Sequence, residues 1–320
     1  MCLAGSYPAG TFQEIRQALS ADRFEMIEAV TQAQFDEVTD ADAVILRILK
    51  MPCEAFTRFT NLKMVMRWGT GYDSVDIEEA GRRGIIVSNT PGINAFAVAE
   101  LVIAFMINLS RHVFGYFQNT QNANWDRNAF SNSQSLNQKK VGLIGGGNIG
   151  RQVAQKAQVF GVQVQYFDVC RLKPETEETY GMTYVDFDTL IATSDIISLH
   201  LPLLDSTRHT INVEQLARMK KGALLINAAR GGLVDDEALL DALKSGHLGG
   251  AGLDCVENEE SATTYELGKT PNVLITPHIG GCVCDLGSMI VPVIVENLIA
   301  LEAGRDVANI VNEVFLQTKK

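Results

Sequence analysis

The sequence predicts an α/β protein built from two parallel-sheet domains. Its 320 residues are enough for two domains of ordinary size, each with its own core. From residue 143 onward, short and nearly continuous apolar runs alternate with segments of helical periodicity. This alternation is typical of buried parallel strands joined by crossover helices. The first ninety residues repeat the pattern on a smaller scale, so the sequence favours a second sheet of the same kind.

The N-terminal part begins with an amphipathic helix and continues with alternating strands and helices. A Thr90-Pro91-Gly92 turn could end this part of the chain. The helix that follows, over 95–113, is apolar nearly all round, so we expect it to be buried between domains or against a second copy of the chain. The expected elements are helices over 11–19 and 52–59 and strands over 43–48, 64–68 and 85–88.

The larger part of the chain contains a longer series of the same elements. Gly246 is expected to end the last helix of the series in a left-handed cap. Strands are predicted over 141–145, 162–168, 196–202, 223–228, 251–256 and 273–276, with helices over 149–160, 186–193, 212–219 and 235–245.

The net charge, the N-terminal sequence and the length of the longest apolar stretch argue against several classes of partner. With 27 Lys and Arg against 38 Asp and Glu, the net charge is −11, which disfavours nucleic acid and anionic lipid. The N-terminus lacks the basic start and apolar core of a secretory signal. The most apolar stretch, 95–109, is shorter than the roughly 20 residues of a membrane span and contains Glu100. We therefore expect a cytoplasmic protein with no nucleic-acid or membrane partner.

The six cysteines do not predict a metal site. The only close pair is Cys282 and Cys284, and neither a second pair nor a suitably placed histidine completes a zinc set. In a cytoplasmic protein these residues are expected to be reduced thiols. No metal is expected.

A glycine-rich turn follows the predicted strand at 141–145. Gly145, Gly147 and Gly150 satisfy the G-x-G-x-x-G pattern of a Rossmann domain, and Asn148 and Ile149 lie where the next helix begins. Glycine permits the tight turn, the close approach of a pyrophosphate and the packing of helix on strand. The N–H groups of the helix terminus would bind that pyrophosphate.

Asp168 strengthens this interpretation. It ends the next predicted strand, eighteen residues after Gly150. A carboxylate there accepts hydrogen bonds from the adenosine ribose and repels a 2′-phosphate, so NAD is the expected cofactor. Arg171, three residues further on, leaves some tolerance for NADP.

Several downstream segments resemble the D-isomer-specific 2-hydroxyacid dehydrogenase family. The resemblance covers nearly the whole chain, and its motifs occur in the family's order. It rests on Ala228-Ala229-Arg230-Gly231-Gly232-Leu233-Val234-Asp235, Leu253-Asp254-Cys255-Val256-Glu257-Asn258-Glu259, Thr276-Pro277-His278-Ile279-Gly280-Gly281, His200-Leu201-Pro202-Leu203, and Asn89-Thr90-Pro91-Gly92 with Val98-Ala99-Glu100.

The resemblance implies a discontinuous architecture. Residues 1–93 and 289–320 would form a flavodoxin-like substrate domain, and a Rossmann NAD-binding domain, 94–288, would be inserted into it. The substrate would be a small 2-hydroxy or 2-keto acid, and the family is usually homodimeric. The implied cofactor contacts add six residues to the glycine turn and Asp168, namely Pro202, Thr207, Ala228, Ala229, Asp254 and Gly280.

Three residues carry the chemistry that the resemblance implies. The planar guanidinium of Arg230 suits a substrate carboxylate. His278 would be the general acid in reduction and the general base in oxidation. Glu259 would accept a hydrogen bond from the other ring nitrogen of His278 and raise the pKa of the imidazole. Glu257 is the competing candidate in an acidic run, and Glu260 stands where the family has proline.

The substrate itself is less sharply indicated. Arg47, Thr70 and Gly71 lie in segments that resemble the family's substrate loops. The sequences of these segments are most similar to those of the D-3-phosphoglycerate dehydrogenase branch. A glyoxylate/hydroxypyruvate reductase and a D-lactate-type dehydrogenase are alternatives. An NAD(H)-sensing scaffold, similar to family members that act as corepressors, would keep the same fingerprint.

Overall fold

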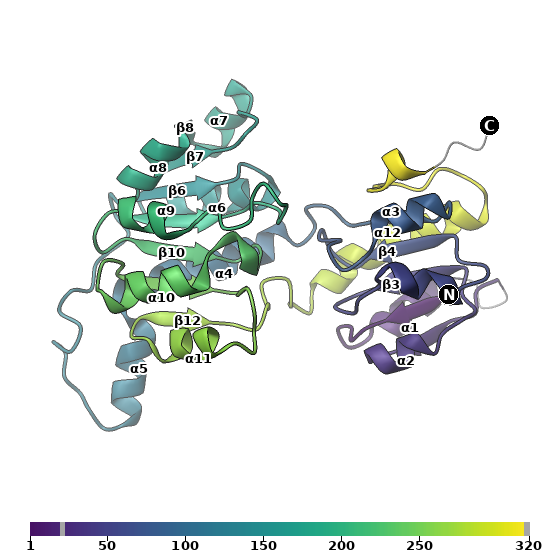
Figure 1. Ribbon diagram of the computed structural model, residues 1–320, viewed down its shortest axis with the longest axis horizontal. Coiled ribbons are helices and arrows are strands. Elements are labelled where there is room, and N and C mark those ends of the chain that lie inside the picture. Colours follow the sequence, from purple (N-terminus) through teal and green to yellow (C-terminus); the bar gives the residue numbers. More distant parts are fainter. Residues whose placement is uncertain (20–22, 317–320) are drawn as a thin grey trace. The chain divides into compact units, whose positions relative to one another are not determined.

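The computed structural model describes residues 1–19 and 23–316, and the chain divides into two compact units (Figure 1). Unit 1 comprises Met1–Asn94 and Val283–Lys320, and unit 2 comprises Ala95–Cys282. Unit 2 is therefore one continuous segment inserted into unit 1. The last four residues of the expected 289–320 segment lie outside the described residues.

Unit 1 is built on a five-stranded parallel sheet in the order β2-β1-β3-β4-β5. The order reverses between β1 and β3, so the loops after these two strands flank a topological switch point, where sheets of this class bind ligands. The strands are β1 (Cys2–Ala4), β2 (Ile27–Ala29), β3 (Ala43–Leu46), β4 (Met64–Arg67) and β5 (Ile86–Ser88).

The helices of unit 1 come from both ends of the chain. Buried Asn312 ties the returning C-terminal segment to the sheet, because its Oδ1 accepts from the Val87 N–H at 2.9 Å and its Nδ2 donates to the Ile85 carbonyl at 2.9 Å. The helix expected over 52–59 is wrong in type: it is a 3₁₀ helix of six residues. The elements are α1 (Thr11–Ala18), α2 (Gln32–Asp36), η1 (Cys53–Arg58), α3 (Ile77–Arg82), α12 (Leu286–Glu302) and η3 (Glu313–Phe315).

Unit 2 is built on a seven-stranded, fully parallel sheet in the order β12-β11-β10-β9-β6-β7-β8. Its switch point lies between β6 and β9. The prediction of two doubly wound parallel sheets is confirmed. The strands are β6 (Lys140–Ile144), β7 (Gln163–Phe167), β8 (Met182–Tyr184), β9 (Ile196–Leu199), β10 (Leu224–Asn227), β11 (Gly250–Leu253) and β12 (Val273–Ile275).

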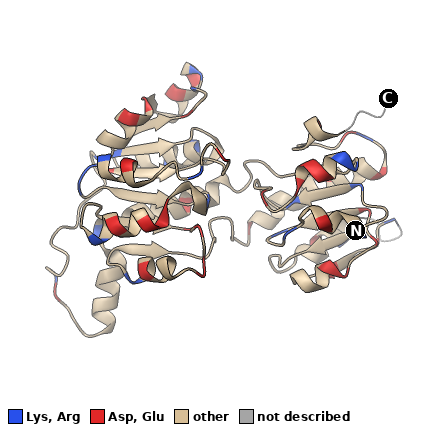
Figure 2. Ribbon diagram, viewed as in Figure 1, with Lys and Arg blue, Asp and Glu red and all other residues tan. Residues whose placement is uncertain are grey.

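Helices cover both faces of this sheet (Figure 1). One core cluster includes buried residues of α4 and α6, and the other includes those of α9 and α10. Figure 2 shows acidic residues recurring along α7 and α10, whose outer faces are solvated. The helices are α4 (Ala95–Arg111), α5 (Val113–Gln121), α6 (Asn148–Gln158), α7 (Pro174–Tyr180), α8 (Phe187–Thr193), α9 (Val213–Arg218), α10 (Asp236–Lys244) and α11 (Ala262–Lys269), together with the 3₁₀ helix η2 (Gly231–Leu233).

The long apolar helix ends earlier than expected. It stops at Arg111, because His112 adopts a left-handed conformation with φ of 48° and a new helix, α5, begins at Val113. The two helices meet at a bend of 66°. In the described part of the chain, no single helix has the length and apolar character to cross a membrane, although this bent pair meets both criteria together. No residue of α5 is buried.

Candidate functional site

The glycine turn joins β6 to α6 in unit 2. Gly145 has φ of 109°, in the left-handed region that glycine tolerates, and a Cβ there would lie 2.5 Å from the His200 carbonyl oxygen. A Cβ on Gly150 would lie 2.2 Å from the Gly145 carbonyl oxygen, whereas one on Gly147 would meet nothing within 4 Å. The first and third glycines are therefore required by the turn itself. Gly147 is different, because the space beside it is open.

The N-terminus of α6 has unsatisfied donors. Its N-cap residue is Gly147, and no side chain in the described part of the chain caps the helix. Asn148 Oδ1 instead accepts from Arg151 Nη2 at 2.8 Å. The free N–H groups and the helix dipole therefore favour an anion at this end. Asp168 lies against the same turn, since its Oδ2 accepts from the Gly146 N–H at 2.8 Å.

The β9 end of the switch point contributes a loop and a buried imidazole. Thr207 Oγ1 closes the loop by donating to the Pro202 carbonyl at 2.7 Å and accepting from the Leu204 N–H at 2.8 Å. Both ring nitrogens of His200 are buried without a hydrogen-bond partner among the described residues. Burial lowers the pKa of His200 to about 3, so the ring is neutral.

Arg230 follows β10 in a turn that Asn227 shapes. Asn227 Nδ2 donates to the Arg230 carbonyl at 2.8 Å, and its Oδ1 accepts from the Ala229 N–H at 3.1 Å. Ala228 and Ala229 are buried, whereas Arg230 is partly exposed. Sequence reasoning missed Asn227. The available signal was a polar residue at the end of an otherwise apolar strand.

Asp254 holds the segment that carries His278. Its Oδ1 accepts from Thr276 Oγ1 at 2.5 Å and from the Ile279 N–H at 2.8 Å, and its Oδ2 accepts from the Gly280 N–H at 2.8 Å. Its backbone carbonyl accepts from the His278 N–H at 3.0 Å. His278 is exposed and has φ of 54°, a strained conformation for this residue. The buried carboxylate of Asp254 thus fixes the backbone on both sides of an accessible imidazole.

The loops after β10 and β11 converge at Cys255. Its thiol lies 3.5 Å from the Ala229 carbonyl oxygen. Burial, reinforced by the charge of Asp254, raises the pKa of Cys255 to about 12, and the charges of Arg230 and Glu259 also act on it. No hydrogen bond joins Glu259 to His278 within residues 1–19 and 23–316, so that pairing remains a prediction.

Glu257 is fixed by contacts that sequence reasoning missed. Its carboxylate accepts from Arg208 Nη1 at 2.6 Å and lies 3.0 Å from His209 Nε2. Its N–H donates to Asp236 Oδ2 at 2.8 Å. Glu257 is thus the anchor of the loop, and its carboxylate is already engaged.

In unit 1, Thr70 connects the loops after β4 and β5. Its Oγ1 donates to Asn94 Oδ1 at 3.1 Å and accepts from the Gly92 N–H at 3.2 Å, and its carbonyl accepts from Asn89 Nδ2 at 2.7 Å. Because the Thr70 side chain is used in this way, the loop would meet a ligand through its backbone. Gly71 is held through its carbonyl by Arg67 Nε at 2.9 Å. On the next loop, the guanidinium of Arg47 donates to the Ser6 carbonyl.

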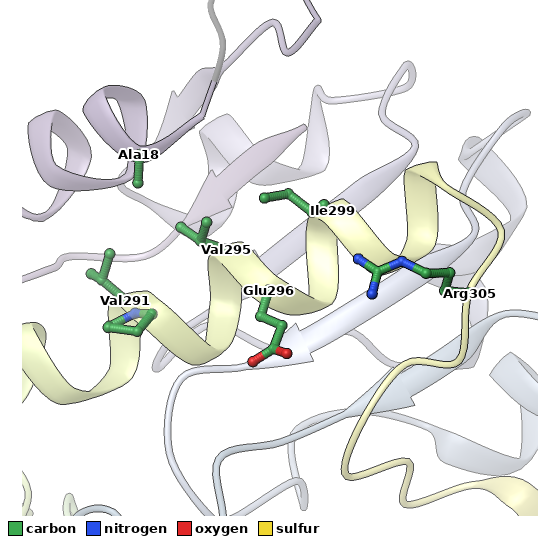
Figure 3. A pocket seen from close by; sticks show the side chains of 7 residues that line it. Ala18, Val291, Val295, Glu296, Ile299 and Arg305 are labelled. Atoms are coloured by element: carbon green, nitrogen blue, oxygen red, sulfur yellow. The ribbon is translucent and has the colours of Figure 1, made fainter.

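A pocket of about 430 Å³ in unit 1 contains none of the predicted site residues (Figure 3). Ala18 of α1 lies on one side, Val291, Val295 and Ile299 line it from α12, and Arg305 closes one end. Its walls are mostly apolar. Glu296 and Arg305 are its charged lining residues.

Comparison with known proteins identifies the family. Residues 103–280 match the family described as D-isomer specific 2-hydroxyacid dehydrogenase, NAD binding domain. The chain is 38% identical over 288 residues to a glyoxylate reductase of Thermococcus litoralis, with 88% of this chain and 86% of the relative covered. The chain belongs to this family. It is therefore an NAD-dependent oxidoreductase that acts on a CH–OH group.

Two further family members extend the comparison. A hydroxypyruvate reductase of Thermotoga maritima is 39% identical over 251 residues, with 78% of this chain and 80% of the relative covered. The crystal structure of a D-lactate dehydrogenase from Aquifex aeolicus, complexed with NAD and lactic acid, superposes with a TM-score of 0.85 at 27% identity. The comparison covers 98% of this chain and 99% of the other.

The cofactor of this dehydrogenase is NAD, and the turn after β6 fits it. The open space at Gly147, the uncapped N-terminus of α6 and the carboxylate of Asp168 beside the turn are the features that a dinucleotide needs. No group of three or more His, Cys, Asp or Glu side chains that could hold a metal ion was found among the described residues.

Proposed function

We propose that this dehydrogenase uses NADH to reduce glyoxylate or hydroxypyruvate to the corresponding 2-hydroxy acid. The observation that carries the proposal is the similarity, over most of the chain, to relatives named for these two reactions. These two substrates are thus better supported than 3-phosphoglycerate, which the sequence of the substrate loops favoured. D-Lactate chemistry is a second candidate because of the structural neighbour that holds lactic acid.

Arg230 is the proposed anchor of the substrate. Asn227 and buried Ala229 fix its turn, and Arg230 Nη1 donates to the Ala229 carbonyl at 2.7 Å, so the guanidinium is held at a rigid strand end. Its fork matches a carboxylate bidentately and would place the neighbouring carbonyl in one orientation. Bound NADH supplies the hydride.

His278 is the proposed general acid. In reduction, its ring donates a proton to the carbonyl oxygen as that oxygen gains negative charge, and in oxidation it accepts the proton. Glu259 is proposed to accept a hydrogen bond from the other ring nitrogen, which would fix the tautomer and favour the imidazolium. Asp254 fixes the backbone around His278, which would hold the imidazole in a defined place for this pairing.

The nucleotide is proposed to lie along the carboxyl ends of the unit 2 strands. The N–H groups at the start of α6 would bind the pyrophosphate, and Asp168 would bind the adenosine ribose. The remaining proposed contacts are Pro202 and Thr207 after β9, Ala228 and Ala229 after β10, and Asp254 and Gly280 after β11 and β12. Unit 2 would thus be the nucleotide domain. Unit 1 would be the substrate domain, with Arg47, Thr70 and Gly71 in its loops.

Two broader properties belong to the same proposal. A homodimer is supported by the outward-facing apolar side chains of α5 and the loop after it, including Phe117 and Trp125, which are 53% and 73% exposed. A cytoplasmic location is proposed as well, because the six cysteines are scattered along the sequence and do not form the framework of a disulfide-rich secreted protein. Light scattering after size-exclusion chromatography tests the dimer.

The function is tested by the loss of NADH absorbance with glyoxylate, hydroxypyruvate, pyruvate, oxaloacetate and 3-phosphohydroxypyruvate offered separately. The highest kcat/KM is expected for glyoxylate or hydroxypyruvate. Arg230→Ala and His278→Ala should abolish turnover while NADH still binds. Preference for the phosphorylated acid would refute the proposed substrate, and tight NADH binding with no turnover would favour the sensing scaffold.

A further inference from the structure

Arg171 lies beside the edge of the proposed nucleotide site. The segment that follows β7 folds back onto the glycine turn: Asp168 Oδ1 accepts from the Cys170 N–H at 3.1 Å, while Asp168 Oδ2 accepts from the Gly146 N–H. A Cβ placed on Gly146 would lie 3.1 Å from a methyl group of Leu172. Arg171 stands between these two fixed residues. It is the cation nearest in sequence to the carboxylate proposed to bind the ribose.

The guanidinium of Arg171 is nevertheless directed to a different partner. It binds Glu177 of α7 through two parallel bonds, from Nε at 2.8 Å and from Nη2 at 2.9 Å. It also stacks over the Tyr184 ring, 5.2 Å from its centre. A bidentate, stacked arginine is held in one orientation more firmly than a surface lysine would be.

Glu177 is held in turn by Tyr166. The buried Tyr166 hydroxyl donates to Glu177 Oε1 at 2.6 Å and accepts from the Leu172 N–H at 2.9 Å. The bonds from Arg171 and Tyr166 lower the pKa of Glu177 to about 2, so the carboxylate is charged at any working pH. The Arg171–Glu177 pair is therefore fixed to the sheet.

We infer that Glu177 is a specificity-determining residue, which holds Arg171 in an ion pair and so withholds it from the 2′-phosphate of NADPH. A guanidinium near the ribose is the group that usually accommodates that phosphate. Here Arg171, the arginine closest in sequence to Asp168, is already paired with the Glu177 carboxylate, and Asp168 adds a second negative charge. The inference rests on the proposed placement of the adenosine ribose at Asp168.

The test measures nucleotide binding without turnover. Isothermal titration calorimetry compares 2′,5′-ADP with 5′-ADP in the wild type, Glu177→Gln, Arg171→Ala and the double variant. Glu177→Gln should tighten 2′,5′-ADP binding about fivefold, the factor expected for releasing one well-formed surface ion pair. Binding of 5′-ADP should change less than about twofold. Arg171→Ala alone should leave both affinities nearly unchanged, and the double variant should lose the gain.

Glu175→Gln is the matched control, because it removes the same charge from the first turn of the same helix without touching Arg171. If Glu175→Gln tightened 2′,5′-ADP binding as much as Glu177→Gln, the change in net charge alone would explain the effect, and the inference would be overturned. A marked loss of 2′,5′-ADP affinity in Arg171→Ala would also overturn it, since Arg171 would then already serve the phosphate. Failure of 5′-ADP to bind the wild type would refute the placement at Asp168. A wrong substrate assignment would leave all these affinities intact.

Discussion

Gly147 and Gly150 belong to the same turn, yet an added methyl group should act differently at the two positions. At Gly150, a Cβ would lie 2.2 Å from the Gly145 carbonyl oxygen and 3.3 Å from its carbon, and backbone atoms cannot rotate away. At Gly147, a Cβ would meet nothing within 4 Å, and φ is −69°, which any residue adopts. Gly150→Ala should therefore damage the fold. Gly147→Ala should damage only the binding of the nucleotide.

The expected magnitudes follow from these contacts. Overpacking at Gly150 should cost about 1–3 kcal/mol of unfolding free energy, or about 2–12 °C in Tm for a unit of this size. Gly147→Ala should change the stability of the free protein by less than ~0.5 kcal/mol. Its methyl group would occupy the space that a pyrophosphate needs. Loss of one charge-assisted hydrogen bond, about 1.5–3 kcal/mol, corresponds to NADH binding roughly 10- to 100-fold weaker.

Two measurements separate these effects: urea unfolding of the free protein and a fluorescence titration with NADH. Gly268→Ala is the control, because it adds the same methyl group to α11, where only the Ile275 side chain lies within 4 Å, at 3.9 Å. The control should bind NADH normally. If Gly147→Ala binds NADH as the wild type does, the pyrophosphate does not approach this turn and the reasoning fails.

Three further predictions concern the anchors of the fold and of the site. Asn312→Ala should lower the unfolding free energy by about 2–4 kcal/mol in chemical denaturation, because two buried backbone groups lose their partner; a loss below ~1 kcal/mol would contradict this. Burial raises the pKa of Asp236 from 3.8 to about 6, so the contribution of this carboxyl group to stability should fall as pH rises from about 4 to 6. Asp236→Asn should remove that contribution, and its unfolding free energy at pH 7 should exceed that of the wild type by about 1 kcal/mol after allowance for screening. The prediction would be refuted if the difference in unfolding free energy between variant and wild type stayed constant from pH 4 to pH 7. Glu259→Gln should lower kcat about 100-fold and shift the pH profile of reduction, whereas Glu257→Gln should lower kcat less than about threefold; equal losses in steady-state assays would show that the roles are wrongly assigned.

Hydrophobic periodicity predicted the sheets well but not the ends of their strands. The run over 196–202 was expected to be a strand throughout, yet β9 ends at Leu199. Leu201 and Leu203 lie in the following loop and still pack against the core. An apolar residue therefore indicates that its side chain is buried, not that its backbone is hydrogen-bonded to a neighbouring strand. The sequence alone could not distinguish a buried strand residue from a buried loop residue.

Short elements and local breaks were missed for a different reason. β1, β2 and β8 contain three residues each and at most one β-branched residue, whereas the equally short β5 and β12, which were predicted, contain two. The break between α4 and α5 depends on the left-handed conformation of His112. Nothing in the apolar composition of the helix indicates it. The glycine turn could be predicted because its geometry is local, whereas the Arg208–Glu257 contact joins residues 49 positions apart.

The acidic run after β11 contains two candidate carboxylates whose surroundings differ in the structure. Glu257 and Glu259 were both candidates for the partner of His278, but the Glu257 carboxylate is bound by Arg208 and His209. Glu259, in contrast, makes no hydrogen bond within the described part of the chain. Anchoring the loop at Glu257 leaves Glu259 available two residues further on.

The missing proline at position 260 has a similar explanation. Asn258 Oδ1 accepts from the Glu260 N–H at 3.1 Å, and the Asn258 carbonyl accepts from Thr264 Oγ1 at 2.8 Å. These bonds fix the backbone that proline would otherwise restrict. A proline at 260 would remove the N–H that Asn258 binds. In this chain, a hydrogen-bonded turn therefore restricts the backbone where the family uses the fixed φ angle of proline. The absence of that proline is thus compatible with Glu259 as the proposed partner of His278.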